Sequence, residues 1–155
     1  MKILLSIIFL HTIEGQVPPI DLDNVPFAVS ACLQTEANRL EISRRINPFY
    51  LRGDFDGDGK LDYVVLVQNR KSEKKGFAFC FAGANRKPHI VAAGQAIALE
   101  GGIRRDDLSA FDLWGVAESW SKKPKKDALY LERAESGSGI LIWNGVRMIW
   151  RQLGI

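Results

Sequence analysis

The chain has 155 residues, of which 46% are hydrophobic and 25% are charged. Both shares are ordinary for a globular protein and argue against a disordered or fibrous chain, and the length predicts a single domain. The net charge of +3 is too small to indicate a nucleic-acid-binding protein.

The first fifteen residues have the pattern of a secretory signal peptide. Lys2 supplies a positive charge, and an apolar run from Ile3 to Leu10 follows it. That run is too short to span a bilayer, which requires about 20 apolar residues. We expect cleavage after Gly15, which leaves residues 16–155 as one soluble domain without a membrane-spanning stretch, in the periplasm or outside the cell. A buried first strand is the alternative.

The next segment predicts a helix, because apolar residues recur at near-helical spacing from Val25 to Arg45. Asn24 and Pro26 suit the start of this helix, and Asn47–Pro48 suits its end.

Strands are expected after the helix. Phe49–Gly53 leads into an acidic loop, Leu61–Gln68 leaves it, and Phe77–Phe81 alternates bulky and small residues. A short strand follows at His89–Ala93. Residues 94–126 show no clear pattern, and a short helix and an irregular strand are both open for Asp106–Trp120. Near the C-terminus, Asn144–Gly145 between apolar runs predicts a hairpin with a two-residue turn, in which Leu141, Trp143, Val146, Met148 and Trp150 share the core face.

The order of these elements predicts an α+β fold, with the N-terminal helix packed on a mainly antiparallel sheet of hairpins. A small β-sandwich with the helix appended to it is the alternative. If the helix packs on the small face of the Phe77–Phe81 strand, Cys80 lies near Cys32. An oxidising compartment then favours a disulfide between them, and two buried free thiols are the alternative.

The most specific motif is the acidic loop, which carries aspartates at loop positions 1, 3, 5 and 9: Asp54, Asp56, Asp58 and Asp62. Calcium requires six to eight hard oxygen ligands, which a tightly curled loop of short carboxylates can supply. Lys60, at position 7, is expected to offer its backbone carbonyl and to turn its ammonium away. The site is not an EF-hand, because position 12 is not a glutamate and the flanks predict strands.

Residues 53–67 resemble the DxDxDGxxD calcium loops of FG-GAP and VCBS-type repeats. The resemblance implies that one calcium ion is bound by Asp54, Asp56, Asp58, the Lys60 carbonyl and Asp62. Those families repeat the unit around a propeller, whereas this chain has one copy, so no propeller is implied. A plain acidic hairpin turn and a different metal are the alternatives. The C-terminal run from Glu135, with Trp143-Asn-Gly, is similar to small exported bacterial proteins that carry one such loop.

Signals for catalysis are sparse. His89 is the single histidine that remains after signal removal, and no Gly-x-Ser-x-Gly motif surrounds a nucleophile. The sequence therefore leans towards a protein that is not an enzyme.

The sequence also predicts a surface that binds a partner. Two tryptophans lie beside a basic loop, and together they form a candidate surface for a protein or an envelope component: Trp114, Trp120, Lys122, Lys123, Lys125 and Lys126. Packing of the two tryptophans in the core is the alternative.

We therefore expect an exported calcium-binding domain that acts by binding, such as an inhibitor or an immunity-type protein. A hydrolase with structural calcium and a purely structural or adhesion-related calcium module are the alternatives.

Overall fold

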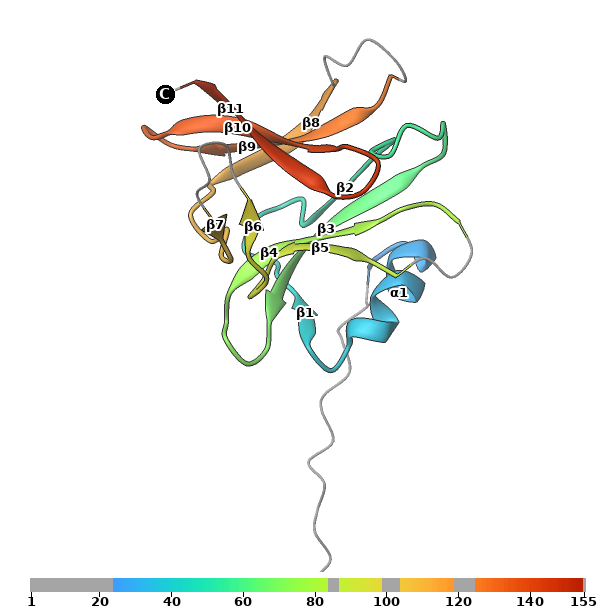
Figure 1. Cartoon of the computed structure of the whole chain (residues 1–155). Coiled ribbons are helices and arrows are strands. Elements are labelled where there is room, and N and C mark those ends of the chain that lie inside the picture. Colours follow the sequence, from blue (N-terminus) through green and yellow to red (C-terminus); the bar gives the residue numbers. More distant parts are fainter. Residues whose placement is uncertain (1–23, 84–86, 99–103, 119–124, 155) are drawn as a thin grey trace, which may run out of the picture.

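In a computed structural model of the chain, the described residues are 24–83, 87–98, 104–118 and 125–154. The predicted signal peptide, residues 1–15, lies outside them. The described elements are one short helix, one 3₁₀ turn and eleven strands (Figure 1): α1 (Phe27–Leu33), η1 (Gln34–Glu36), β1 (Leu40–Ile42), β2 (Tyr50–Gly53), β3 (Asp62–Asn69), β4 (Lys75–Cys80), β5 (His89–Ala92), β6 (Ile97–Ala98), β7 (Arg104–Arg105), β8 (Leu113–Glu118), β9 (Asp127–Arg133), β10 (Gly137–Trp143) and β11 (Met148–Gly154).

Two antiparallel sheets account for most of these strands. The first sheet has the order β1-β3-β4-β5, with β2 also paired to β3, and the second sheet has the order β11-β10-β9-β8. Strands β6 and β7 form a separate pair. Figure 1 shows the two sheets stacked, with helix α1 on the opposite side of the first sheet from the second sheet.

The first sheet is buried on both faces, and its central strands explain why. In β3, Val64 and Leu66 pack in the core between the two sheets, whereas Val65 and Val67 pack in a second core below α1. Successive side chains of a strand point to opposite faces, so a strand covered on both sides must be apolar at every position. This requirement accounts for the unbroken Val64–Val67 run.

The predicted α+β fold is wrong: the chain is mostly β, with two antiparallel sheets and a short helix. The helix predicted over Val25–Arg45 ends at Leu33, and Leu40–Ile42 forms strand β1 instead. Strand β2 pairs only with the first half of β3, which leaves the edge of Val67–Asn69 free for β1. Pairing these backbone groups outweighs the helical spacing of the side chains, because buried backbone groups require partners.

The second sheet includes a strand in the segment Asp106–Trp120, for which the sequence left a short helix and an irregular strand open. Strand β8 lies within the segment that showed no clear pattern, and it pairs with β9 along its whole length. Only Trp114 of its six residues is buried. An edge strand with so little burial carries almost no alternation of polar and apolar residues.

The hairpin is placed correctly, but its predicted turn is too short. Trp143 pairs with Met148, so the loop contains four residues, and the Asn144 side chain accepts hydrogen bonds from the backbone of Val146 and Arg147. Relative to the predicted register, the pairing of the two strands is shifted by two residues. A shift by an even number of residues keeps each side chain on its predicted face of the sheet. Leu141, Met148 and Trp150 are therefore in the core, as predicted, but Val146 is 80% exposed at the loop.

The predicted disulfide is confirmed. Cys32 of α1 and Cys80 of β4 are bonded, with their Cα atoms 5.9 Å apart. The bond holds the helix against the outer face of the first sheet. Within the described residues, no helix is long and apolar enough to cross a bilayer.

Candidate metal centre

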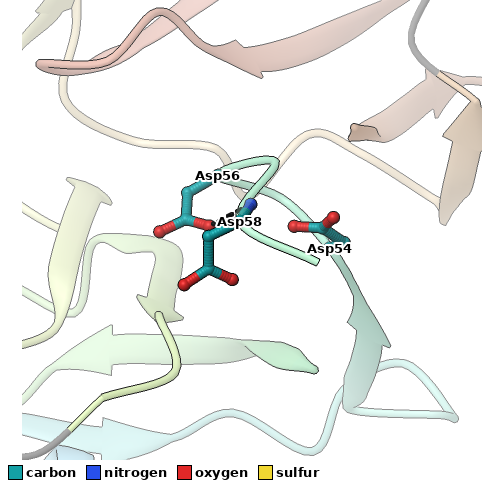
Figure 2. A group of neighbouring side chains, drawn as sticks. All are labelled: Asp54, Asp56 and Asp58. Atoms are coloured by element: carbon teal, nitrogen blue, oxygen red, sulfur yellow. Dashed lines mark hydrogen bonds between the residues drawn. The ribbon is translucent and has the colours of Figure 1, made fainter. Parts of the chain in front are cut away.

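The acidic loop connects β2 to β3 and brings three of its carboxylates together. One oxygen from each of Asp54, Asp56 and Asp58 lies within 4.8 Å of the others, and this group could hold a metal ion. Figure 2 shows the Asp54 carboxylate facing those of Asp56 and Asp58 across the loop.

Hydrogen bonds from the loop's own backbone hold these carboxylates in place. Asp54 accepts from the amides of Gly57 at 2.8 Å and Gly59 at 3.0 Å, and Asp56 accepts from the amide of Asp58 at 3.1 Å. Both glycines have a φ near +80°, which other residues rarely adopt. Each carboxylate has about four lone-pair positions, so these bonds leave capacity for a cation.

Asp62, the fourth expected ligand, lies outside the group of three carboxylates. Its side chain is fully buried and accepts hydrogen bonds from the amides of Phe55 at 2.9 Å, Asp56 at 3.3 Å and Ala82 at 2.6 Å. Burial raises the pKa of Asp62, and the nearby Asp56 charge acts in the same direction, while the backbone hydrogen bonds oppose this shift. Through these bonds Asp62 braces the base of the loop against the end of β4.

Lys60 differs from its predicted orientation. Its ammonium turns towards the cluster and pairs with Asp58 at 2.9 Å, although the lysine side chain is 63% exposed. An exposed pair of this kind contributes little stability. The ammonium compensates part of the negative charge of the loop, and a bound cation would compete with it for Asp58.

No motif in the sequence pointed to Asp127, which ties the loop to the second sheet. Its carboxylate accepts a hydrogen bond from the amide of Asp54 at 2.8 Å, and its own amide donates to the Asp54 carbonyl at 2.7 Å. Gly53 is required beside it, because a Cβ there would lie 2.7 Å from the Asp127 carboxylate. On the other side, the loop is anchored by Phe55, which is buried edge-on against Phe79.

The tryptophan–lysine surface is not assembled in the described part of the chain. Trp114 is buried, stacks on Phe77 with ring centroids 5.5 Å apart, and donates to the carbonyl of Pro48 at 2.9 Å. It therefore belongs to the core, which was the alternative for this residue. Trp120, Lys122 and Lys123 lie outside the described residues.

The two remaining lysines of that surface point to partners within the chain. The Lys125 ammonium pairs with Glu118 at 3.1 Å, and the Lys126 ammonium donates to the carbonyl of Trp143. Lys126 thereby links the start of β9 to the hairpin loop.

His89 lies at the junction of the two sheets. Its ring meets Trp143 edge-on, with ring centroids 4.9 Å apart, and burial lowers its pKa. Among the described residues, no hydrogen bond joins His89 to a serine or an acidic side chain. The contacts are those of a packed aromatic ring.

Comparisons with protein families, curated proteins and solved structures find no match to this chain. Function must therefore be inferred from the geometry of this molecule itself.

Proposed function

We propose that this chain is an exported calcium-binding module that acts by binding a partner and not by catalysis. One calcium ion is held by Asp54, Asp56 and Asp58, with the Lys60 carbonyl and water completing the ligands. The observation that carries the proposal is the convergence of the three carboxylates within 4.8 Å.

The charge of the loop favours a cation, and its geometry favours calcium. Three clustered carboxylates repel one another, and a bound cation would relieve that repulsion. Magnesium requires a near-ideal octahedron with short bonds, whereas calcium accepts six to eight oxygens in irregular arrangements. Carboxylates on alternate residues of a short loop, together with water, meet the calcium requirement more readily.

The position of the loop suggests what the ion does. The loop and the β10–β11 hairpin loop lie at the same end of the molecule, on the right in Figure 1. The Asp54–Asp127 hydrogen bonds connect this end of the first sheet to the second sheet. A bound ion would hold the end rigid, and a rigid surface loses less entropy when it binds a partner. An inhibitor or immunity-type protein that binds a protein or an envelope component fits this arrangement.

Export is supported by the disulfide as well as by the expected signal peptide. Bonds such as Cys32–Cys80 persist in oxidising compartments and are rare in the cytosol. We therefore place the module in the periplasm or outside the cell.

Calcium titration calorimetry tests the metal site, with Asp56→Asn as the test variant and Glu135→Gln as a matched control on the exposed turn before β10. We expect one-site binding in the unaltered protein and in the control, and none in Asp56→Asn. Free calcium at about 100 times Kd should stabilise the fold by about 2.7 kcal/mol, measured by urea unfolding. Absence of heat, with equal stability in calcium and in chelator, would mean that the loop is a plain acidic hairpin that binds no calcium.

A further inference from the structure

A hollow of about 580 Å³ opens on the first sheet beside its edge strand β2. Small-molecule sites commonly have volumes of about 300–1,000 Å³. The hollow is separate from the metal cluster, and nine residues from the start of α1, the segment before β2, β2 itself and β3 line it: Asn24, Pro26, Asn47, Pro48, Phe49, Tyr50, Leu51, Arg52 and Tyr63.

Three aromatic rings form one side of the hollow, and the fold holds them in place. Phe49 meets Tyr50 edge-on with ring centroids 5.4 Å apart, and Tyr50 lies 6.3 Å from Tyr63. Both tyrosines also pack against the core below α1. The guanidinium of Arg44 covers the Phe49 ring at 4.3 Å. The two half-buried tyrosine rings, Tyr50 and Tyr63, are therefore the preformed platform for a ligand with an apolar face.

The polar groups of the hollow are available for a ligand. No hydrogen bond or ion pair within the described chain engages the Asn24 or Asn47 amides, the Tyr50 or Tyr63 hydroxyls, or the Arg52 guanidinium. The two amides and two hydroxyls can each donate and accept. None of the nine lining residues is acidic, so the charge of the lining is that of Arg52.

We infer that this hollow binds an acidic saccharide. A sugar ring has an apolar C–H face that packs on the tyrosine rings, and its neighbouring hydroxyls match side chains that both donate and accept. A wholly apolar ligand would leave those polar groups unpaired, which is costly. The carboxylate of the sugar pairs with Arg52, whose planar guanidinium can bind it with two parallel hydrogen bonds.

The test uses the full chain and a panel of acidic sugars: galacturonate and glucuronate oligomers, N-acetylmuramic acid and N-acetylneuraminic acid. Neutral counterparts such as galactose oligomers and N-acetylglucosamine are titrated beside them. Calorimetry measures the affinity, and amide chemical shifts of Tyr50, Leu51 and Tyr63 report the place of binding. We expect at least one acidic sugar to bind at those residues and its neutral counterpart to bind about tenfold more weakly or not at all.

Two arginine variants test whether Arg52 binds the carboxylate of the sugar. Arg52→Gln, at an exposed position that should not disturb folding, should weaken binding of the acidic sugar about tenfold, as loss of a charged hydrogen bond implies. Arg151→Gln, at an exposed position on β11, removes the same charge and should leave the affinity unchanged. Binding should persist in calcium chelator, so that this inference and the calcium proposal can fail separately.

Three results would overturn the inference. The first is that no acidic sugar shifts Tyr50, Leu51 or Tyr63. The second is that neutral sugars bind equally well and Arg52→Gln has no effect. The third is that a proline-containing peptide shifts these residues while the sugars do not, which would make the hollow a peptide site.

Discussion

The two sheets of this protein are buried to different extents. The first sheet has the second sheet on one face and α1 on the other, and Val64, Val65 and Val67 of β3 are fully buried. In the second sheet, Leu141 of β10 faces the core, but the paired Ile142 and Ile149 on the opposite face are only half-buried. The central strand β10 of the second sheet also has a continuous apolar run, Ile140–Trp143, so the two sheets differ in how far their outer faces are covered and not in the pattern of their central strands.

Both proposed sites are built on the sheet that is covered twice. The metal loop joins β2 to β3, and the hollow lies beside β2 with Tyr63 of β3 in its lining. The second sheet supports the loop through Asp127 of β9. Binding groups that are supported by packed elements are held more accurately than those on free loops.

Among these changes, removal of the disulfide should lower the free energy of unfolding most, because the bond holds helix α1 over the outer face of the first sheet. Cys32 and Cys80 are 48 residues apart, for which the chain-entropy model gives a loss of about 4 kcal/mol at most. Urea unfolding of the Cys32→Ala/Cys80→Ala variant, beside the unaltered protein, measures it. A loss below about 1 kcal/mol would mean that packing alone holds the helix on the sheet.

Glycine substitutions test how closely each sheet is packed. A Cβ at Gly76 of β4 would lie 2.1 Å from the Val91 carbonyl of the neighbouring strand, so Gly76→Ala must displace backbone. We expect a loss of about 3 kcal/mol, at the upper end for overpacking. Gly115→Ala on β8 is the matched control, since nothing lies within 4 Å of its Cβ position. Thermal and urea unfolding of both variants measure the difference, and similar losses would contradict it.

A pair of truncations compares the outer faces directly. Val65→Ala removes two fully buried methyl groups below α1 and should cost about 2 kcal/mol. Ile142→Ala removes more carbon from the outer face of the second sheet but should cost only about 1 kcal/mol, because that side chain is half-buried. Equal losses in urea unfolding would show that another part of the chain covers the second sheet.

The pH dependence of stability should show the smallest effect, at the contact between His89 and Trp143 that joins the sheets. Burial lowers the pKa of His89, so the unfolded chain binds more protons between that pKa and the ordinary value of about 6.5. Stability therefore falls slightly as the pH drops through this window and recovers above it. Urea unfolding between about pH 5 and pH 8 should show a flatter profile for His89→Gln; identical profiles would show that His89 does not titrate there.

Local patterns in the sequence were sufficient to predict several parts of the fold. The strands on both sides of the acidic loop, the place of the β10–β11 hairpin and the Cys32–Cys80 pairing follow from side-chain period, turn residues and the expected redox environment. The clustering of Asp54, Asp56 and Asp58 follows from their spacing in one short loop. These features depend on residues close in sequence or on a pair of cysteines without competitors.

Tertiary structure decided what depends on distant partners. Leu40–Ile42 became a strand because β3 had unpaired backbone groups there, and Trp114 became a core residue because β8 joined the second sheet. Asp62 accepts a hydrogen bond from the amide of Ala82. Asp127 accepts one from the amide of Asp54, which lies 73 residues earlier in the chain. These bonds join groups that are far apart in the sequence, so only the folded chain shows which donors each carboxylate reaches.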